Sequence, residues 1–340
     1  MSDLDSFANE APASRAEAFQ EAAARLGFSQ AIIEKDFWVC WSLEKLFALP
    51  SFGDHLIFKG GTSLSKAYAA IHRFSEDVDL SLDRAQLGFV GDQDPENPDI
   101  SGGRRKALLE DLQSAAETCV NGPLLSELTT MFTEHLADEL QLVADPLDTQ
   151  TLLFTYPSGV ADGSGSNYVR PIIRLEFGAR GVQLPAEDRT IAPYVSEAIP
   201  SLMQHPATQT RVLGIERTFW EKATILHMLF HQPEGKPVAD RMSRHYYDMA
   251  MLIAHPSKET AMANLQLLED VAHHKSVFFK AAWANYEKAK PGSLRLLPSA
   301  DIENHLRQDY RGMREMIIGD VPDWDAIITT IGAVEAEINV

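Results

Sequence analysis

The chain has 340 residues, 45% of them hydrophobic, which is enough apolar material for a core and for two or three sub-domains. Its formal net charge of −19 lowers the expectation of a nucleic-acid substrate, because phosphate backbones recruit Lys and Arg, although a local basic patch is compatible with an acidic chain. No apolar run is long enough to cross a bilayer, the first residues are acidic, and the two cysteines lack metal-ligand spacing, so a cytoplasmic protein with reduced thiols and no membrane association is expected.

Helical periodicity dominates the first fifty residues. Residues 1–13 are polar and predict a frayed end, while the pattern from Ser14 to Leu26 predicts a helix. A second helix, capped at Ser29, carries a wide apolar stripe. Near its start, Glu34-Lys35-Asp36 is interpreted as the charged bracing of a packing helix in preference to a catalytic group. Residues 1–50 are therefore predicted as a segment of N-terminal helices.

The next stretch combines a short strand with a glycine turn. Leu56, Ile57 and Phe58 form an apolar run that ends at Gly60-Gly61, which indicates a buried strand entering a tight turn. Thr62 then suits the N-cap of a helix. Backbone N–H groups at such a turn favour a polyphosphate, so the stretch is a candidate phosphate cradle.

A second strand follows with two acidic residues on one face. Val78, Leu80 and Leu82 alternate with Asp77, Asp79 and Ser81, so the two aspartates project from the same side. Carboxylates spaced in this way can share divalent cations. A phosphate cradle beside a metal clamp is what phosphoryl or nucleotidyl transfer needs. The alternative is an ordinary strand–turn–helix–strand unit with surface acids.

Here the sequence resembles a known family. Phe58-Lys59-Gly60-Gly61-Thr62-Ser63-Leu64, followed by Arg73-Phe74-Ser75-Glu76-Asp77-Val78-Asp79-Leu80, is similar to the signature of the AbiEii/AbiGii toxins. These are nucleotidyltransferase-like proteins of the DNA-polymerase-β superfamily, and they include the MenT-type toxins. The resemblance implies Mg²⁺ or Mn²⁺ on Asp77 and Asp79. It further implies an NTP whose phosphates bind near Lys59, Gly60, Gly61, Thr62, Ser63, Lys66 and Arg73.

The middle of the chain is predicted to complete a sheet. Strands are expected at Thr151 to Tyr156, at Tyr168 to Phe177 and at Thr190 to Val195, with a Gly/Ser-rich hairpin from Ser158 to Ser166 after the first of them. Sites of the polymerase-β type commonly recruit a third carboxylate from a neighbouring strand. Glu176 is the candidate for this third metal ligand, and the equally weighted alternative is an outward-facing acid paired with Arg174.

Beyond residue 211 the pattern is helical to the end. In Arg217-Thr218-Phe219-Trp220-Glu221-Lys222-Ala223, Lys222 matches a lysine of the family's second motif and could hold triphosphate oxygens, or it could simply be solvated. Arg241, Arg244, His245 and Asp248 have helical spacing. They resemble the third motif, in which an aspartate equivalent to Asp248 is needed for activity. The alternative is an intrahelical Arg–Asp ion pair.

Together these observations predict an α+β protein, with a mixed sheet of the nucleotidyltransferase type, flanking helices and a C-terminal helical domain. The expected divisions are residues 1–50, residues 51–205 as the nucleotidyltransferase core and residues 206–340, with the active site between the core and the helical domain. The expected catalytic groups are Asp77, Asp79, Lys222 and Asp248, with Arg244 among the nucleotide contacts.

The resemblance implies transfer of an NMP from an NTP to an acceptor, which could be the tRNA 3′ end. The protein would be a toxin of a toxin–antitoxin or phage-defence system, restrained by a cognate antitoxin. Two alternatives remain open. One is a toxin that binds NTP or GTP without covalent transfer, and the other is transfer of the NMP to a protein, which the acidic net charge favours slightly.

Overall fold

The computed structural model describes residues 2–160 and 170–340. The chain divides into two compact units. The first comprises Met1–Ala67, Phe74–Gln93 and Ala107–Val212, and the second comprises Tyr68–Arg73, Asp94–Lys106 and Leu213–Val340. Across the described parts of the chain, no helix has both the length and the apolar character that a membrane span requires.

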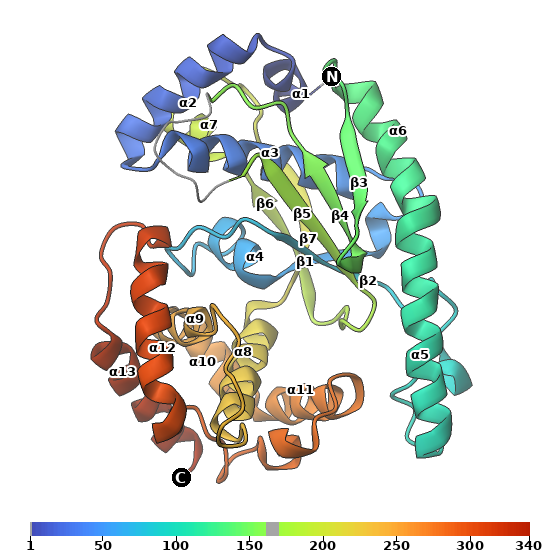
Figure 1. Cartoon of the computed structure of the whole chain (residues 1–340), viewed down its shortest axis with the longest axis vertical. Coiled ribbons are helices and arrows are strands. Elements are labelled where there is room, and N and C mark those ends of the chain that lie inside the picture. Colours follow the sequence, from blue (N-terminus) through green and yellow to red (C-terminus); the bar gives the residue numbers. More distant parts are fainter. Residues whose placement is uncertain (1, 161–169) are drawn as a thin grey trace. The chain divides into compact units, whose positions relative to one another are not determined.

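A seven-stranded mixed sheet forms the centre of the first unit, in the order β3-β4-β5-β2-β1-β7-β6 (Figure 1). β1 is antiparallel to β2 and parallel to β7, and β2 is parallel to β5, which continues antiparallel through β4 and β3. The predicted α+β class with a mixed sheet is therefore confirmed. The strands are β1 (Leu56–Lys59), β2 (Val78–Leu82), β3 (Gln141–Asp145), β4 (Asp148–Thr155), β5 (Ile172–Gly178), β6 (Ala186–Ile191) and β7 (Thr208–Leu213).

Helices pack on this sheet and supply an aromatic core. α3 contacts β5, and its Trp38 and Trp41 lie against Phe132, Phe154 and Tyr156 with ring centroids 4.7–6.0 Å apart. α5 continues through one π-helical turn into α6, so the two helices form a single long run (Figure 1). The helices are α1 (Asp3–Ala8), α2 (Pro12–Leu26), α3 (Gln30–Phe47), α4 (Gly60–Lys66), α5 (Gly102–Cys119), α6 (Leu125–His135) and α7 (Tyr194–Ala198).

The second unit is helical, as predicted for the C-terminal part of the chain. α8 contacts α9, α10 and α11, and α9 contacts α12 and α13. Trp324 lies between Tyr246 and Tyr310, with ring centroids 5.4 and 5.6 Å away, in the core of this unit. The helices are α8 (Ile215–Phe230), α9 (Ser243–Ala254), α10 (Ser257–Ala263), α11 (Leu265–Phe278), α12 (Ala300–Met313) and α13 (Trp324–Ile338).

Three sequence predictions about local structure differ from the structure. The N-terminus is not frayed, because Leu4 and Phe7 on α1 are buried. The strand predicted at Thr190 to Val195 is displaced toward the N-terminus: β6 ends at Ile191, and Pro193, which cannot donate to a ladder, is the N-cap of α7. α4 begins at Gly60, with Lys59 at its N-cap in place of Thr62. The hairpin predicted from Ser158 to Ser166 lies largely outside the described residues.

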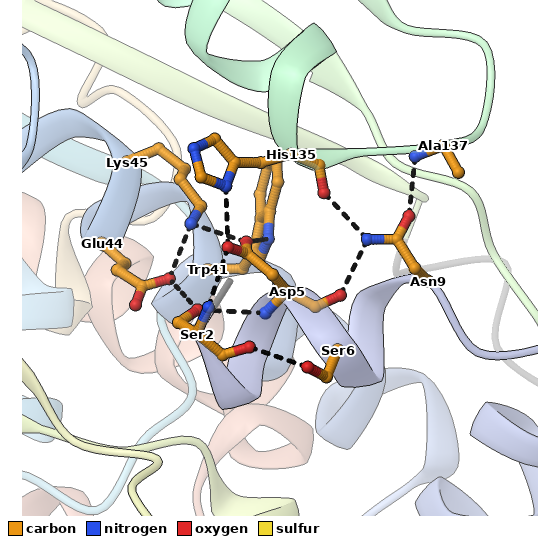
Figure 2. A network of polar contacts seen from close by, with 9 residues as sticks. All are labelled: Ser2, Asp5, Ser6, Asn9, Trp41, Glu44, Lys45, His135 and Ala137. Carbon is orange, nitrogen blue, oxygen red and sulfur yellow. Dashed lines mark hydrogen bonds and ion pairs between the residues drawn. The ribbon is translucent and has the colours of Figure 1, made fainter.

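The N-terminal helix is held by a buried network around Asp5, shown in Figure 2. One carboxylate oxygen of Asp5 lies 2.6 Å from Nζ of Lys45 and accepts from the indole N–H of Trp41 at 3.0 Å. The other lies 2.7 Å from Nδ1 of His135 and accepts from the backbone N–H of Ser2 at 3.2 Å. Burial would raise the pKa of Asp5, but Lys45 and His135 together lower it below its ordinary value. A single carboxylate thus joins α1 to α3 and α6.

Asp5→Asn is expected to destabilise the protein by up to about 3 kcal/mol, because it breaks the buried ion pair with Lys45 and leaves that ammonium only the partly exposed Glu44 carboxylate, 3.0 Å away. Since the folded state lowers the pKa of Asp5, the stabilisation is complete above the ordinary value of 3.8 and is lost as the pH falls through the folded value. Urea unfolding at neutral and acidic pH measures both effects. The exposed substitution Glu17→Gln is the control. Equal stability of the two variants at neutral pH would contradict the prediction.

Candidate active site

The two aspartates predicted as metal ligands lie on β2 in a row of polar residues that crosses the sheet. Asp79 is the register partner of Lys59 on β1 and of Glu176 on β5, so these three side chains share one face. Asp77, two residues before Asp79, points to the same side. Within the described residues the carboxylates of Asp77 and Asp79 accept no hydrogen bond and form no ion pair. The sheet therefore gathers two carboxylates that have no ion-pair partner among the described residues, those of Asp77 and Asp79, beside Glu176, which contacts Arg174.

The acidic side chains of this cluster also repel one another. Burial raises the pKa of Asp77, and the carboxylates of Glu76 and Asp79 raise it further. Burial also raises the pKa of Glu176, again with Asp79 and Asp77 adding to the effect. Like charges held together in this way are destabilising for the fold alone, and a bound cation would relieve them.

The donor set fits a divalent metal that is only partly held by protein. Mg²⁺ prefers oxygen ligands and is commonly bound by one or two carboxylates, with water and substrate phosphates completing its shell. Nowhere in residues 2–160 and 170–340 do three or more His, Cys, Asp or Glu residues form a group that could hold a metal ion. Glu176 instead accepts from Nε of Arg174 at 3.2 Å, so its role as a third ligand stays a prediction. Asp77 and Asp79 are the pair that fits.

The glycine turn contacts this acidic pair directly. Gly60 has a φ of +81°, and a Cβ built on it would lie 2.0 Å from Oδ2 of Asp79. The hydroxyl of Thr62 donates to the carbonyl oxygen of Asp77, and the hydroxyl of Ser63 donates to that of Gly60 at 2.9 Å. Only glycine fits at position 60, for both backbone and steric reasons. The predicted phosphate turn and the predicted metal ligands are thus parts of one local structure.

The two lysines of this stretch have different surroundings. Lys59 is half-buried, and its ammonium makes no hydrogen bond or ion pair with the part of the chain that the structure describes. Lys66 is buried, with Nζ 2.8 Å from Oδ1 of Asp36 and 3.6 Å from the centre of the Tyr194 ring. Lys59 is therefore available to a phosphate, whereas the charge of Lys66 is already compensated within the first unit.

The second unit brings together four other residues that the sequence singled out. Nε and Nη2 of Arg73 lie 2.7 and 2.9 Å from the two carboxylate oxygens of Asp248. Nζ of Lys222 lies 2.7 Å from Oδ2 of Asp248 and 3.2 Å from Nδ1 of His245. The carboxylate has no exposed surface, so its contacts are with the protein itself. Arg241, predicted on the same helix face, precedes α9 and has a φ of +64°.

This cluster carries more positive than negative charge. Burial would raise the pKa of Asp248, but Arg73 and Lys222 hold it well below its ordinary value. Burial and the neighbouring Lys222 and Arg244 lower the pKa of His245 well below 6.5, so the imidazole is neutral at pH 7. Three cations thus accompany one carboxylate. An excess of buried or half-buried positive charge of this kind suits an anion such as a phosphate.

Sequence reasoning weighed Arg174 as a partner of Glu176, and the structure shows that contact, but it missed Lys35 as a partner of the acidic cluster. Arg174 contacts Glu176 and also Asp145, a residue of the unpredicted strand β3. Lys35, interpreted as helix bracing, has its Nζ 2.8 Å from Oε2 of Glu76. The signal for Lys35 was present in the run Glu34-Lys35-Asp36, because three consecutive charges within the apolar stretch from Ile32 to Trp41 are unusual.

The chain matches the family described as "Nucleotidyl transferase AbiEii toxin, Type IV TA system" over residues 41–330. Two similar solved structures are MenT4, nucleotidyltransferase toxin Rv2826c from Mycobacterium tuberculosis H37Rv, and JHP933 from Helicobacter pylori. MenT4 is 17% identical with a TM-score of 0.45, covering 96% of this chain and 99% of that chain. JHP933 is 15% identical with a TM-score of 0.41, covering 92% of this chain and 93% of that chain. No curated protein matches the chain.

The family match includes both clusters described above. It contains the strand–turn–helix that carries Lys59 and Gly60, the Asp77 and Asp79 pair, and the helices that carry Lys222 and Asp248. The chain therefore belongs to the AbiEii family of nucleotidyl transferase toxins of type IV toxin–antitoxin systems.

Proposed function

We propose that the protein transfers an NMP from an NTP to an acceptor with the help of Mg²⁺ or Mn²⁺, and that a cognate antitoxin restrains it. The observation that carries this proposal is the pair Asp77 and Asp79, whose carboxylates have no partner among the described residues. The Asp79 carboxylate lies against Gly60, and the Asp77 carbonyl oxygen accepts from Thr62 of the same turn. The resemblance to the AbiEii/AbiGii toxins suggests the tRNA 3′ end as acceptor. NTPs and tRNA occur together in the cytoplasm, where we place the reaction.

The proposed reaction is an in-line displacement at phosphorus. An acceptor hydroxyl oxygen forms a bond to the α-phosphorus, the bond between the α-phosphorus and the bridging oxygen breaks, and pyrophosphate leaves while the hydroxyl proton passes to solvent. A divalent metal would supply charge stabilisation to the attacking and leaving oxygens. Asp77 and Asp79 would hold it, and the backbone at Gly60, Gly61, Thr62 and Ser63, together with the Lys59 ammonium, would bind the phosphates.

A role in nucleotide binding is proposed for the second cluster as well. The cationic side chains of Lys222, Arg73 and Arg244 would neutralise the charge of the phosphates, including the negative charge that develops on the leaving pyrophosphate. Asp248 has no exposed surface and both of its oxygens are engaged, so we propose that it acts by holding Arg73 and Lys222 in place and not by touching the substrate.

A label-transfer assay tests the proposal. Each of the four NTPs, labelled with ³²P at the α-position, is incubated with the protein, Mg²⁺ and total cellular RNA, and the products are separated on gels that resolve RNA from protein. Label on RNA that is lost with EDTA and with Asp79→Asn supports the proposal. Label on protein would make the acceptor a protein. If calorimetry detects NTP binding but no label is transferred, the protein would instead be a toxin that binds the nucleotide without covalent transfer.

Gly60→Ala is expected to lower transfer by ~10²-fold, because a Cβ at this position must displace the Asp79 carboxylate and small displacements of reacting groups have effects of this size. The φ of +81° adds a stability cost of about 1–2 kcal/mol. Transfer rates at equal folded fraction, judged by circular dichroism, give the measurement. The matched control is Gly103→Ala, where a Cβ meets no atom within 4 Å. Transfer at the wild-type rate by a folded Gly60→Ala protein would contradict the inference that a Cβ at position 60 displaces the Asp79 carboxylate.

A further inference from the structure

Helix α3 carries three consecutive charged residues, all of them buried. Glu34, Lys35 and Asp36 are only 2, 3 and 3% exposed. Charged side chains are almost never fully buried unless they are paired, since the loss of hydration costs several kcal/mol per ion. Three neighbours in a helix point in different directions, and α3 is covered by α2, α6, α7 and β5. Each charge must therefore be compensated by a different part of the first unit.

Lys35 and Asp36 form ion pairs with residues next to the proposed nucleotide site. Nζ of Lys35 lies 2.8 Å from Oε2 of Glu76. Oδ1 of Asp36 lies 2.8 Å from Nζ of Lys66, and its Oδ2 accepts from the backbone N–H of Tyr194 at 2.6 Å. The carboxylate of Glu34 serves another segment, since it accepts from the hydroxyl of Ser158 at 2.6 Å and from the next backbone N–H at 2.7 Å.

The partners of Lys35 and Asp36 lie where the chain leaves and re-enters the first unit. Lys66 is the last residue of α4, the helix that starts at the Gly60 turn, and Glu76 directly precedes Asp77. The residues between them, 68–73, belong to the second unit. Within the second unit, residues 68–73 are held by contacts that include the ion pair of Arg73 with Asp248. Each end of the segment 67–75 is thus tied to α3 by one ion pair, in which the partner on α3 is buried.

We propose that Lys35 and Asp36 are positioning residues of the nucleotide site, which hold the Gly60 turn and the Asp77 and Asp79 pair in place through Lys66 and Glu76. The inference rests on the proposed function for the role of those groups. At 3% exposure neither Lys35 nor Asp36 can itself contact a nucleotide. Their effect is transmitted because Glu76 is covalently next to Asp77, and a shift of about 1 Å in a reacting group can cost ~10²-fold in rate.

The same helix offers a matched control for Lys35. Lys45 is also on α3, its side chain is 4% exposed like that of Lys35, and it forms a comparably short ion pair, with Asp5 at 2.6 Å. Lys35→Met and Lys45→Met each remove the lysine of one ion pair and leave a carboxylate that keeps other contacts, so both should lower stability. Only Lys35 is connected to the Asp77 segment, so only its loss should change the site.

The experiment compares the two variants at equal folded fraction. Lys35→Met is expected to lower kcat by ~10–100-fold with a smaller change in KM, whereas Lys45→Met keeps the wild-type kcat. Lys35→Arg should retain most of the activity. In the double variant Lys35→Met/Glu76→Gln, part of the lost stability should recover, because both charges of the ion pair are removed together, while kcat stays low. Stability that recovers without activity separates positioning from simple destabilisation.

A second measurement does not depend on catalysis. Backbone amide hydrogen exchange at residues 74–79 should become faster in Lys35→Met and stay at the wild-type rate in Lys45→Met. Equal exchange at these residues in both variants, or equal kcat losses, would overturn the proposal. If the wild-type protein transfers no label but the exchange of residues 74–79 responds only to Lys35→Met, the anchoring is supported and the proposed reaction is what fails.

Discussion

Asp79→Asn is expected to reduce nucleotidyl transfer by ~10³-fold or more, while the folded protein keeps or gains stability. The loss corresponds to about 4 kcal/mol of transition-state stabilisation, the scale on which a correctly placed metal ion acts. Stability should not fall, because the carboxylate makes no hydrogen bond or ion pair with the described residues and its charge raises the pKa of both Asp77 and Glu176. Asn removes that repulsion, and a group kept at the expense of stability is typical of a functional site.

Three measurements together test this expectation. Label transfer gives the rate, calorimetry with Mn²⁺ and NTP gives the binding, and thermal unfolding with and without Mn²⁺ gives the stability. Asp188→Asn is the control, because this carboxylate of the same unit is 73% exposed and pairs only loosely with Arg211 at 3.7 Å. EDTA-insensitive transfer by Asp79→Asn at the wild-type rate would remove the metal-clamp interpretation of β2.

Asp248→Asn is expected to have the opposite signature, a large loss of stability together with a loss of transfer. The variant leaves Arg73 and Lys222 buried without a carboxylate, which typically costs about 3–5 kcal/mol. Because the folded state holds the pKa of Asp248 well below 3.8, the wild-type stabilisation is complete at neutral pH and is lost only as the pH falls below that value.

Lys222→Met is the informative companion of Asp248→Asn. It removes one cation and keeps the two contacts of Arg73 with Asp248, so it should destabilise less, while it weakens NTP binding by about 2–5 kcal/mol if Lys222 holds phosphate. The double variant should be more stable than Asp248→Asn alone, since one unpaired cation is gone. Urea unfolding and NTP titration measure these effects. Unchanged NTP affinity in a folded Lys222→Met protein would reduce this cluster to a structural role.

Local sequence patterns determined much of the candidate site. The alternation that predicts the strand at Val78 to Leu82 and the apolar run before Gly60-Gly61 both depend on contacts within a few residues, and β1 and β2 confirm them. The spacing of Arg244, His245 and Asp248 likewise predicted a helix, and α9 is that helix. Regular periodicity is a local property, which is why these elements can be identified before the chain is folded.

The tertiary structure alone decided which charged residues meet. Nothing local pairs Arg73 with Asp248, 175 positions later, or Lys35 with Glu76, 41 positions later. The family resemblance marks Asp248 and Lys66 in the sequence, but neither the resemblance nor the local pattern shows that these charges, or that of Lys35, are buried. The strands β3 and β7 were also unpredicted, because edge pairing and neighbours across the sheet select them. The free energy of a buried charge depends on its long-range partners, and the local sequence pattern does not identify those partners.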